Sequence, residues 1–231
     1  RCPPCMILSR TMVALMTGPL ANASGRILLH PRVKIVTESA RLFLERNTQE
    51  YDLIQLTGTE EMTAGSGGLR SIHENFLLTR EGLSLCLKHL SPQGILSATR
   101  GIQSPPRDSI KLFASFAETL EHNGAKKPGA RLAMYRNYLA CSTLAFGSDL
   151  DSKRAEHLYR VCRDLRLDEE WIPHGKMDPT SQISRVSGPE GKPYSYFHHA
   201  ALRLLSSQRE AFYQNWLYRV RPASDERPYF Y

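Results

Sequence analysis

The sequence contains no apolar run that approaches the roughly 20 residues needed to cross a lipid bilayer. It also lacks a secretory signal, because no charged segment at its start is followed by an apolar stretch and a small-residue cleavage site. Its 231 residues are 41% hydrophobic and 23% charged, which is ordinary for a globular protein with its own core. We therefore expect no membrane span in this chain and a cytoplasmic location.

The sequence also lacks a dense basic cluster interleaved with aromatic residues. The net charge is +7, but Lys and Arg are scattered and often paired with acids, as in residues 149–166. A nucleic-acid platform combines a basic groove with stacking aromatic rings. We therefore expect no nucleic-acid partner.

The cysteines do not make a disulfide framework or a complete metal site. Cys2 and Cys5 have the spacing of a zinc or redox half-site, but no second pair accompanies them. Cys86, Cys141 and Cys162 lie within apolar patterns, which favours buried, reduced thiols. We expect no metal.

Residues 33–100 carry the clearest fold signal. Three short apolar runs, residues 33–36, 51–56 and 94–98, read as buried strands separated by helical patterns. This alternation predicts an α/β fold with a doubly wound, mostly parallel sheet, which binds its ligand at the carboxyl ends of the strands. Residues 131–136 and 139–146 are expected to add a C-terminal antiparallel hairpin.

Local signals set the expected boundaries. Ser39 and Asp151 are expected to cap helices, and a Pro pair precedes a helix over residues 107–122. A Gly-, Thr- and Ser-rich loop over residues 57–71 is expected to cover any pocket at the strand ends. Composition changes at residue 173, which predicts a domain over residues 1–173. Residues 174–231 would form a Gly/Pro-rich excursion followed by a helix over residues 196–216.

The fragments VKIVTESARLFL, YDLIQL, ENFLLTREGL and PQGILSATR, followed by the ending DERPYFY, carry a resemblance in this order. The sequence resembles the spermidine synthase-like family of polyamine aminopropyltransferases, and it is most similar to the bacterial branch in which this domain is joined to membrane helices. The resemblance implies a Rossmann-like, class I methyltransferase-like fold. It also implies membrane association through segments outside this chain.

The family's activity is aminopropyl transfer from decarboxylated S-adenosylmethionine to a polyamine. The resemblance implies decarboxylated S-adenosylmethionine or S-adenosylmethionine as a substrate and a small polyamine as the acceptor. On this fold, a glycine-rich turn after the first strand and an acid after the second would hold the adenosyl group. Neither motif stands before Val33. The chain is therefore expected to be a fragment, with the first strand and its glycine turn upstream of Arg1.

The family's remaining site positions are replaced in this chain. Its Asp after the third strand aligns with Ser39, beside Glu38, and its catalytic Asp aligns with Thr57. The resemblance therefore places cofactor contacts at Glu38, Ser39, Ala40 and Thr57. Glu38 can equally be a solvated acid at a strand end.

Thr57 can form hydrogen bonds at the catalytic position but cannot act as a carboxylate base. The carboxylate would then have to come from the loop, where Glu60 and Glu61 are candidates, so the catalytic candidates are Thr57, Glu60 and Glu61. These two acids can also be an ordinary exposed pair. Three functions are therefore compatible with the sequence. They are an impaired aminopropyltransferase, a non-catalytic interaction domain (a pseudoenzyme), and an S-adenosylmethionine-dependent methyltransferase relative. Transferase activity is expected only if the upstream cofactor motif exists, and the acceptor and oligomeric state stay open.

Two further patterns have a structural and a functional interpretation. His198 and His199 could suggest a metal, but adjacent helical positions point in different directions. The C-terminal part is rich in aromatic residues that could stack on a base, although packing of a helix face is the more common meaning. These residues are Tyr194, Tyr196, Phe197, Phe212, Tyr213 and Trp216.

Overall fold

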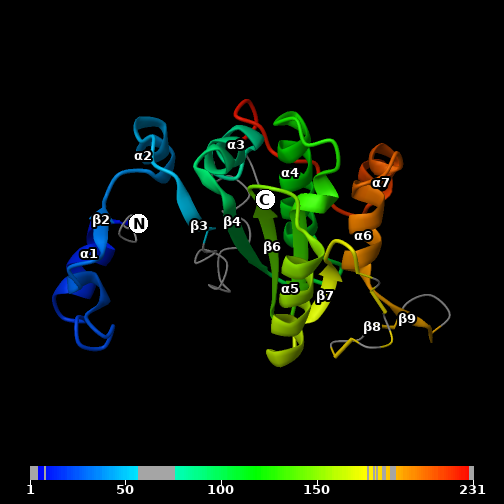
Figure 1. The fold of residues 1–231 in the computed structure, drawn as a ribbon, viewed down its shortest axis with the longest axis horizontal. Coiled ribbons are helices and arrows are strands. Elements are labelled where there is room, and N and C mark those ends of the chain that lie inside the picture. The colour runs from blue at the N-terminus through cyan, green and yellow to red at the C-terminus, as the bar shows by residue number, and fades with distance from the viewer. Residues whose placement is uncertain are drawn as a thin grey trace. The chain divides into compact units, whose positions relative to one another are not determined.

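A computed structural model describes residues 5–7, 9–56, 76–175, 177–178, 180, 182–183, 186–187 and 191–228. The chain divides into two compact units, residues 1–51 and 52–231. Figure 1 traces the elements of each unit, which we describe separately. The loop predicted over residues 57–71 lies outside the described residues. The domain boundary predicted at residue 173 stays a prediction.

The first unit contains a small parallel pair of strands and two helices. Its elements are β1 (Cys5–Ile7), α1 (Arg10–Thr17), a 3-10 turn (Ile27–Leu29), β2 (Lys34–Val36) and α2 (Ala40–Arg46). β1 and β2 pair in parallel. The predicted cap of α2 is confirmed, because the Ser39 hydroxyl accepts a hydrogen bond from the Leu42 amide at 3.2 Å.

The second unit is a five-stranded sheet with helices packed on it. Its strands are β3 (Tyr51–Leu56), β4 (Leu90–Gly101), β5 (Leu132–Arg136), β6 (Ala140–Phe146) and β7 (Asp168–Trp171), with a separate pair β8 (Val186–Ser187) and β9 (Pro193–Tyr194). Its helices are α3 (Arg80–Lys88), α4 (Asp108–His122), α5 (Ser152–Asp164), α6 (Tyr196–Leu204) and α7 (Arg209–Asn215), and a 3-10 turn spans Pro128–Arg131. Together with the first unit, these elements confirm the predicted α/β class.

The sheet order is β3-β4-β6-β5-β7. The predicted hairpin is β5–β6, and the side chain of Asn137 closes it by accepting the amides of Leu139 and Ala140 at 2.8 Å each. Antiparallel pairing extends beyond this hairpin, because β6 returns between β4 and β5 and is antiparallel to both, and β7 is antiparallel to β5.

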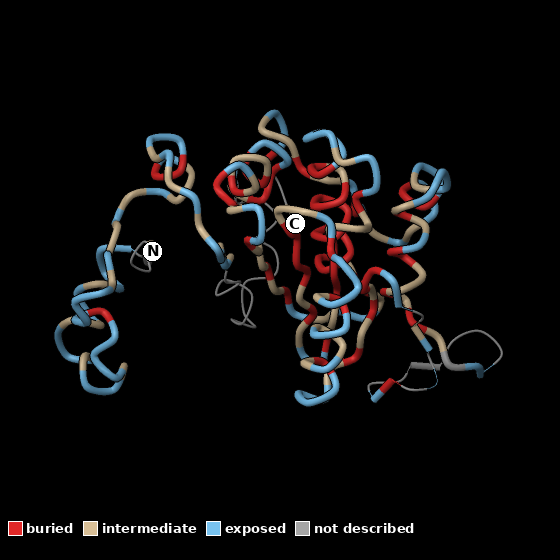
Figure 2. The backbone as a smooth tube through the Cα atoms, in the orientation of Figure 1, coloured by how far each residue is buried: buried red, intermediate tan, exposed pale blue. Residues whose placement is uncertain are grey.

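Helices cover the hairpin, as the buried (red) segments in Figure 2 indicate. Ala133 and Leu144 belong to a cluster with buried residues of α5, including Ala155 and Cys162. Because successive side chains of a strand face opposite sides, the buried Met134 faces away from that cluster. α4 contacts β4, β5 and β6, and twelve of its residues are buried, so it is the central helix of this unit.

The structure differs from the sequence prediction at three places. β4 spans twelve residues instead of the five predicted, and β7 was not predicted. The single helix expected over residues 196–216 is two helices, α6 and α7, because the Ser206 side chain accepts the Gln208 amide and donates to the Arg203 carbonyl between them. No helix formed by the described residues has the length and apolar character of a membrane span.

Candidate functional site

The predicted cofactor residues that the structure describes lie at the start of α2, in the first unit. Ser39 is the helix cap, Ala40 is the first helical residue, and the Glu38 carboxylate lies 3.8 Å from the Arg46 guanidinium. Thr57, Glu60 and Glu61 lie outside the described residues. Cofactor contacts at these positions stay predictions.

In the second unit, a polar cluster lies where β4 ends and α4 begins. The Asp108 side chain is 3% exposed and is the acid of this cluster. It accepts hydrogen bonds from Arg107 Nε at 2.6 Å, Arg107 Nη2 at 3.1 Å and Gln103 Nε2 at 2.9 Å. Asp108 is thus a carboxylate already engaged by a cation and an amide.

Lys111 completes one turn of α4 beside this acid and is 4% exposed. Burial and the nearby charge of Arg219 together lower the pKa of its ammonium group to about 8, while Asp108 acts in the opposite direction. We call Gln103, Arg107, Asp108, Lys111 and Arg219 the α4-start cluster. At neutral pH it holds three cations and one carboxylate, so it carries an excess of positive charge.

Aromatic side chains close one side of the α4-start cluster. The Trp216 indole donates to the Pro106 carbonyl at 3.1 Å, and the Arg107 guanidinium lies 6.0 Å from the Tyr218 ring centroid. These contacts bring residues 216–218 to the segment between β4 and α4. An electron-rich or anionic group suits this cluster better than a cation does.

A second charged group of residues lies between β5, β7 and α6 and is fully enclosed. The Arg136 Nε donates to Glu170 Oε1 at 2.5 Å, and Arg136 Nη1 lies 3.7 Å from Asp168 Oδ2. Ser195 donates a short hydrogen bond to the other oxygen of Glu170 and caps α6 by accepting the His198 amide. We call Arg136, Asp168, Glu170 and Ser195 the Glu170 network.

The Glu170 network is structural in character. Glu170 is 0% exposed, and Arg136 and Asp168 are 4% and 2% exposed, so no ligand reaches them. Burial raises the pKa of Glu170, whereas the bond from Ser195 and the charge of Arg136 lower it. The network fixes β7 and the start of α6 against the hairpin.

The two adjacent histidines diverge, as expected from their positions on a helix. His198 Nδ1 lies 2.7 Å from the Glu170 carbonyl oxygen, whereas His199 packs against the Tyr194 ring at 5.5 Å. Within the described ranges, no three His, Cys, Asp or Glu side chains gather as a metal site would require.

The three internal cysteines are free and buried, which confirms that prediction. Burial raises the pKa of Cys86 and of Cys162 to about 12, so neither is a reactive thiolate at neutral pH.

Asp225, the first residue of the DERPYFY ending, contacts the start of α3 in the second unit. Asp225 accepts the Thr79 hydroxyl at 2.6 Å, and Thr79 itself caps α3 by accepting the Gly82 amide at 3.1 Å. The Asp225 amide in turn donates to Glu81 at 3.0 Å. This part of the ending therefore secures the start of α3.

Sequence reasoning did not identify the α4-start cluster. Asp108 and Lys111 are three residues apart, a spacing that usually means a solvated ion pair on a helix surface. The usable signal was their position at the start of the helix that follows the third predicted strand of the sheet. Their burial depends on α4 packing and on residues 216–219, about a hundred positions away in the sequence.

No known family model matches the sequence, and no curated protein matches it. Among solved structures with a related fold, a probable spermidine synthase from Corynebacterium glutamicum is 22% identical, with a TM-score of 0.42; the match covers 62% of this chain and 50% of that one. The spermidine synthase of Thermotoga maritima is 13% identical with a TM-score of 0.43, and the match covers 90% of this chain and 57% of that one.

A third similar structure is a spermidine synthase in complex with the transition-state analogue AdoDATO. It is 15% identical with a TM-score of 0.44, and the match covers 90% of this chain and 59% of that one. This chain thus spans between half and three fifths of the length of these three proteins. The likeness is one of fold.

Proposed function

We propose that the chain is a spermidine synthase-like protein in which aminopropyl transfer is impaired. The assignment rests on the sequence fragments that resemble the family. They fall on β2, α2, β3, α3 and β4 in the family's order, and the hairpin β5–β6 follows. The reaction of the family would transfer an aminopropyl group from decarboxylated S-adenosylmethionine to a polyamine.

The charge of the α4-start cluster is the observation that carries the proposal of impairment. The acceptor must be held as a cation and then deprotonated by a carboxylate before its amine attacks the activated carbon. Asp108 is the acid of this cluster, and Arg107 and Gln103 already occupy it. Because the α4-start cluster holds more cations than acids, it disfavours a diamine or triamine.

If transfer survives, the base must come from the loop after β3. We propose Glu60 or Glu61 for this role, since Thr57 has no carboxylate. We propose Glu38, Ser39, Ala40 and Thr57 as contacts to the adenosyl substrate. The AdoDATO complex of the related spermidine synthase supports this class of ligand.

The non-catalytic alternative is favoured by the same engaged carboxylate. An interaction domain derived from this fold needs neither a base nor an acidic pocket. A methyltransferase relative would also need no polyamine acceptor. Product analysis separates these possibilities, because only aminopropyl transfer converts putrescine to spermidine and releases 5′-methylthioadenosine.

The test is a transfer assay with decarboxylated S-adenosylmethionine and putrescine, read by mass spectrometry of both products. We expect little or no turnover by the chain as given. In a version extended upstream by the family's glycine-rich turn, Thr57→Asp, which restores a carboxylate at the aligned position, should raise turnover by about 100-fold or more. Thr57→Asn is the matched control and should give no gain.

Three further variants locate any residual base. Residual turnover should fall in Glu60→Gln or Glu61→Gln and persist in Glu156→Gln, which removes an exposed acid from α5. Turnover of about 10 per second by the unmodified chain, unchanged in both loop variants, would overturn the proposed impairment.

A further inference from the structure

A small cavity lies between α6 and α7, next to the α4-start cluster and separate from it. Its volume is about 260 Å³. Four aromatic residues form most of its wall, together with Ala211 and four polar side chains. The lining residues are Tyr194, Tyr196, His199, Arg203, Gln208, Ala211, Phe212, Asn215 and Trp216. The volume is just below the range typical of drug-sized pockets, so it suits a compact ligand with one ring.

The aromatic wall is held in place by contacts of its own. The Phe212 and Trp216 rings stack with centroids 5.0 Å apart, and Tyr196 meets Trp216 edge-on at 6.4 Å. Trp216 is fixed further by its hydrogen bond to the Pro106 carbonyl. Rings that are ordered before a ligand arrives lose little freedom on binding, so this wall is prepared to stack on a planar group.

The charged groups at this cavity have one sign. Arg203 is its permanent cation, and none of the described residues that line it is Asp or Glu. Burial lowers the pKa of His199, and the charges of Arg203 and His198 lower it further, so His199 is a neutral ring at pH 7. The polar end of the cavity therefore favours an anion and disfavours an amine.

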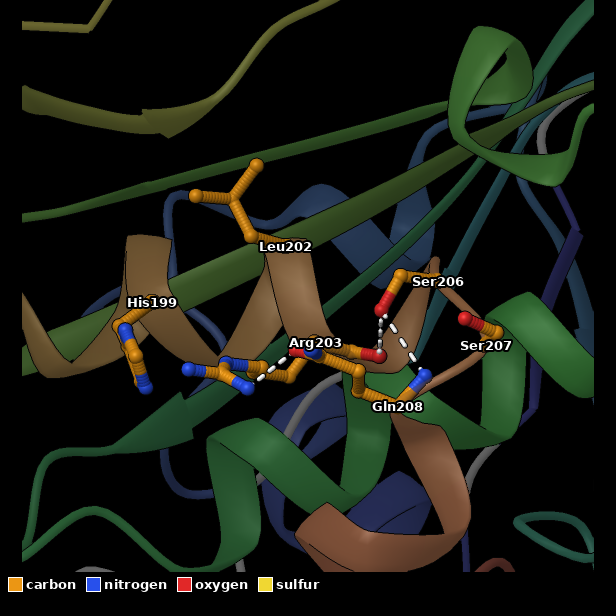
Figure 3. Close-up of a pocket in the computed structure, with 6 residues that line it drawn as sticks. All are labelled: His199, Leu202, Arg203, Ser206, Ser207 and Gln208. Carbon is orange, nitrogen blue, oxygen red and sulfur yellow. Dashed lines mark hydrogen bonds between the residues drawn. The ribbon is translucent and has the colours of Figure 1, made fainter.

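A second, open cavity of about 480 Å³ shares the polar end and is drawn in Figure 3. It is lined by His199, Leu202, Arg203, Ser206, Ser207 and Gln208. In Figure 3 the Arg203 guanidinium lies between His199 and Gln208, and Arg203 donates one short hydrogen bond to the Gln208 amide oxygen. That bond uses one of the five N–H donors of the guanidinium, which leaves a planar fork able to bind carboxylate or phosphate oxygens.

We propose that this cavity binds a small ligand with one aromatic ring and one anionic group, an aryl carboxylate or an aryl phosphate. The ring lies against Tyr196 and Trp216, and the anion lies at Arg203. This site goes beyond the proposed transfer reaction and does not depend on it, since a polyamine carries the opposite charge.

Binding is measured by tryptophan fluorescence, because Trp216 is one of only two tryptophans in the sequence. Phenyl phosphate and benzoate are the probes for the two anions. Phenol supplies the ring without charge, inorganic phosphate the charge without a ring, and benzylamine a ring with a cation. We expect at least one aryl anion to bind with a Kd of about 1 mM or tighter, and each of the three comparison compounds at least about tenfold more weakly.

Two variants assign the site. Arg203→Gln should weaken the aryl anion at least about tenfold while leaving the weak affinity for phenol unchanged, which shows that the cavity is intact. Arg163→Gln, which removes an exposed cation from α5, should bind as the unmodified chain does. The proposal is overturned if neither aryl anion saturates by about 10 mM, if benzylamine binds as tightly as they do, or if Arg203→Gln retains full affinity.

Discussion

The Glu170 network and the α4-start cluster each contain a buried Asp near an Arg, but they differ in closure and in charge. In the network, one arginine faces two acids. Ser195 donates to Glu170, and the Ile183 amide donates to Asp168 at 2.5 Å. In the cluster, one acid is bound by Arg107, and the Lys111 ammonium interacts electrostatically with Arg107, Asp108 and Arg219. The network is closed to solvent, whereas the Arg107 side chain of the cluster is 39% exposed.

This difference separates a structural role from a functional one. A buried carboxylate with both oxygens engaged specifies how elements pack, and its loss removes hydrogen bonds that its buried donors make. A cluster with excess positive charge at an accessible strand end retains a capacity to interact with a ligand. It also repels cations, which is why we place the impairment of polyamine chemistry there.

The largest effect that separates the two regions is expected from Glu170→Ala. This variant breaks the buried ion pair with Arg136 and removes the acceptor of the Ser195 hydroxyl, and it should lower the free energy of unfolding by about 3–5 kcal/mol, measured by urea denaturation. Glu170→Gln should lower the free energy of unfolding by less than half as much, because the amide oxygen can still accept a hydrogen bond. Burial also raises the pKa of the Glu170 carboxyl, so the charge that this variant removes is one that the interior already disfavours. Equal costs for both variants would show that the charge of Glu170 matters more than we infer.

Lys111→Met should raise the free energy of unfolding, in contrast to Glu170→Ala. The unfolded chain holds the Lys111 proton up to pH 10.5, whereas the folded chain holds it only up to about pH 8. Between these values the unfolded state binds more protons, so folding stability rises with pH, and the penalty below pH 8 corresponds to about 3 kcal/mol.

Lys111→Met should therefore stabilise the chain at pH 7, and its advantage should shrink between pH 8 and 10.5. Lys88→Met, which removes an exposed cation from α3, serves as the control and should show no such trend. If the two variants have parallel stability curves over this range, burial of Lys111 does not carry the cost that we assign to it.

A smaller effect is expected where the C-terminal segment meets α3. Thr79→Val removes both the α3 cap and the bond to Asp225, which should lower the free energy of unfolding by about 1–2 kcal/mol. Ser84→Ala removes an exposed side-chain hydrogen bond to Asn123 and should cost less than about 0.5 kcal/mol. Similar losses in both variants would mean that the contact with Asp225 contributes little beyond an ordinary surface bond.

The parts of the structure that the sequence predicted well depend on short-range chemistry. Ser39 and Asp151 cap their helices as expected, because the bond from a cap to an amide three residues on is local. The Asn137 turn depends in the same way on the side chain's own neighbours.

The missed features depend on distant partners. β7 contains Asp168, Glu169 and Glu170, a run that reads as exposed, yet Glu170 is buried because Arg136 meets it from 34 positions earlier. The burial of Lys111 likewise follows from packing around α4 that no local pattern encodes. The sequence could therefore place candidate residues at strand ends, but it could not predict which charges become enclosed.

Calorimetric titration with putrescine tests most directly whether the α4-start cluster excludes a cationic acceptor. We predict no saturable heat up to about 1 mM putrescine for the unmodified chain in the presence of decarboxylated S-adenosylmethionine. A Kd of about 10 μM or tighter would contradict the account, because it would require an acidic acceptor site that the charges around Asp108 oppose.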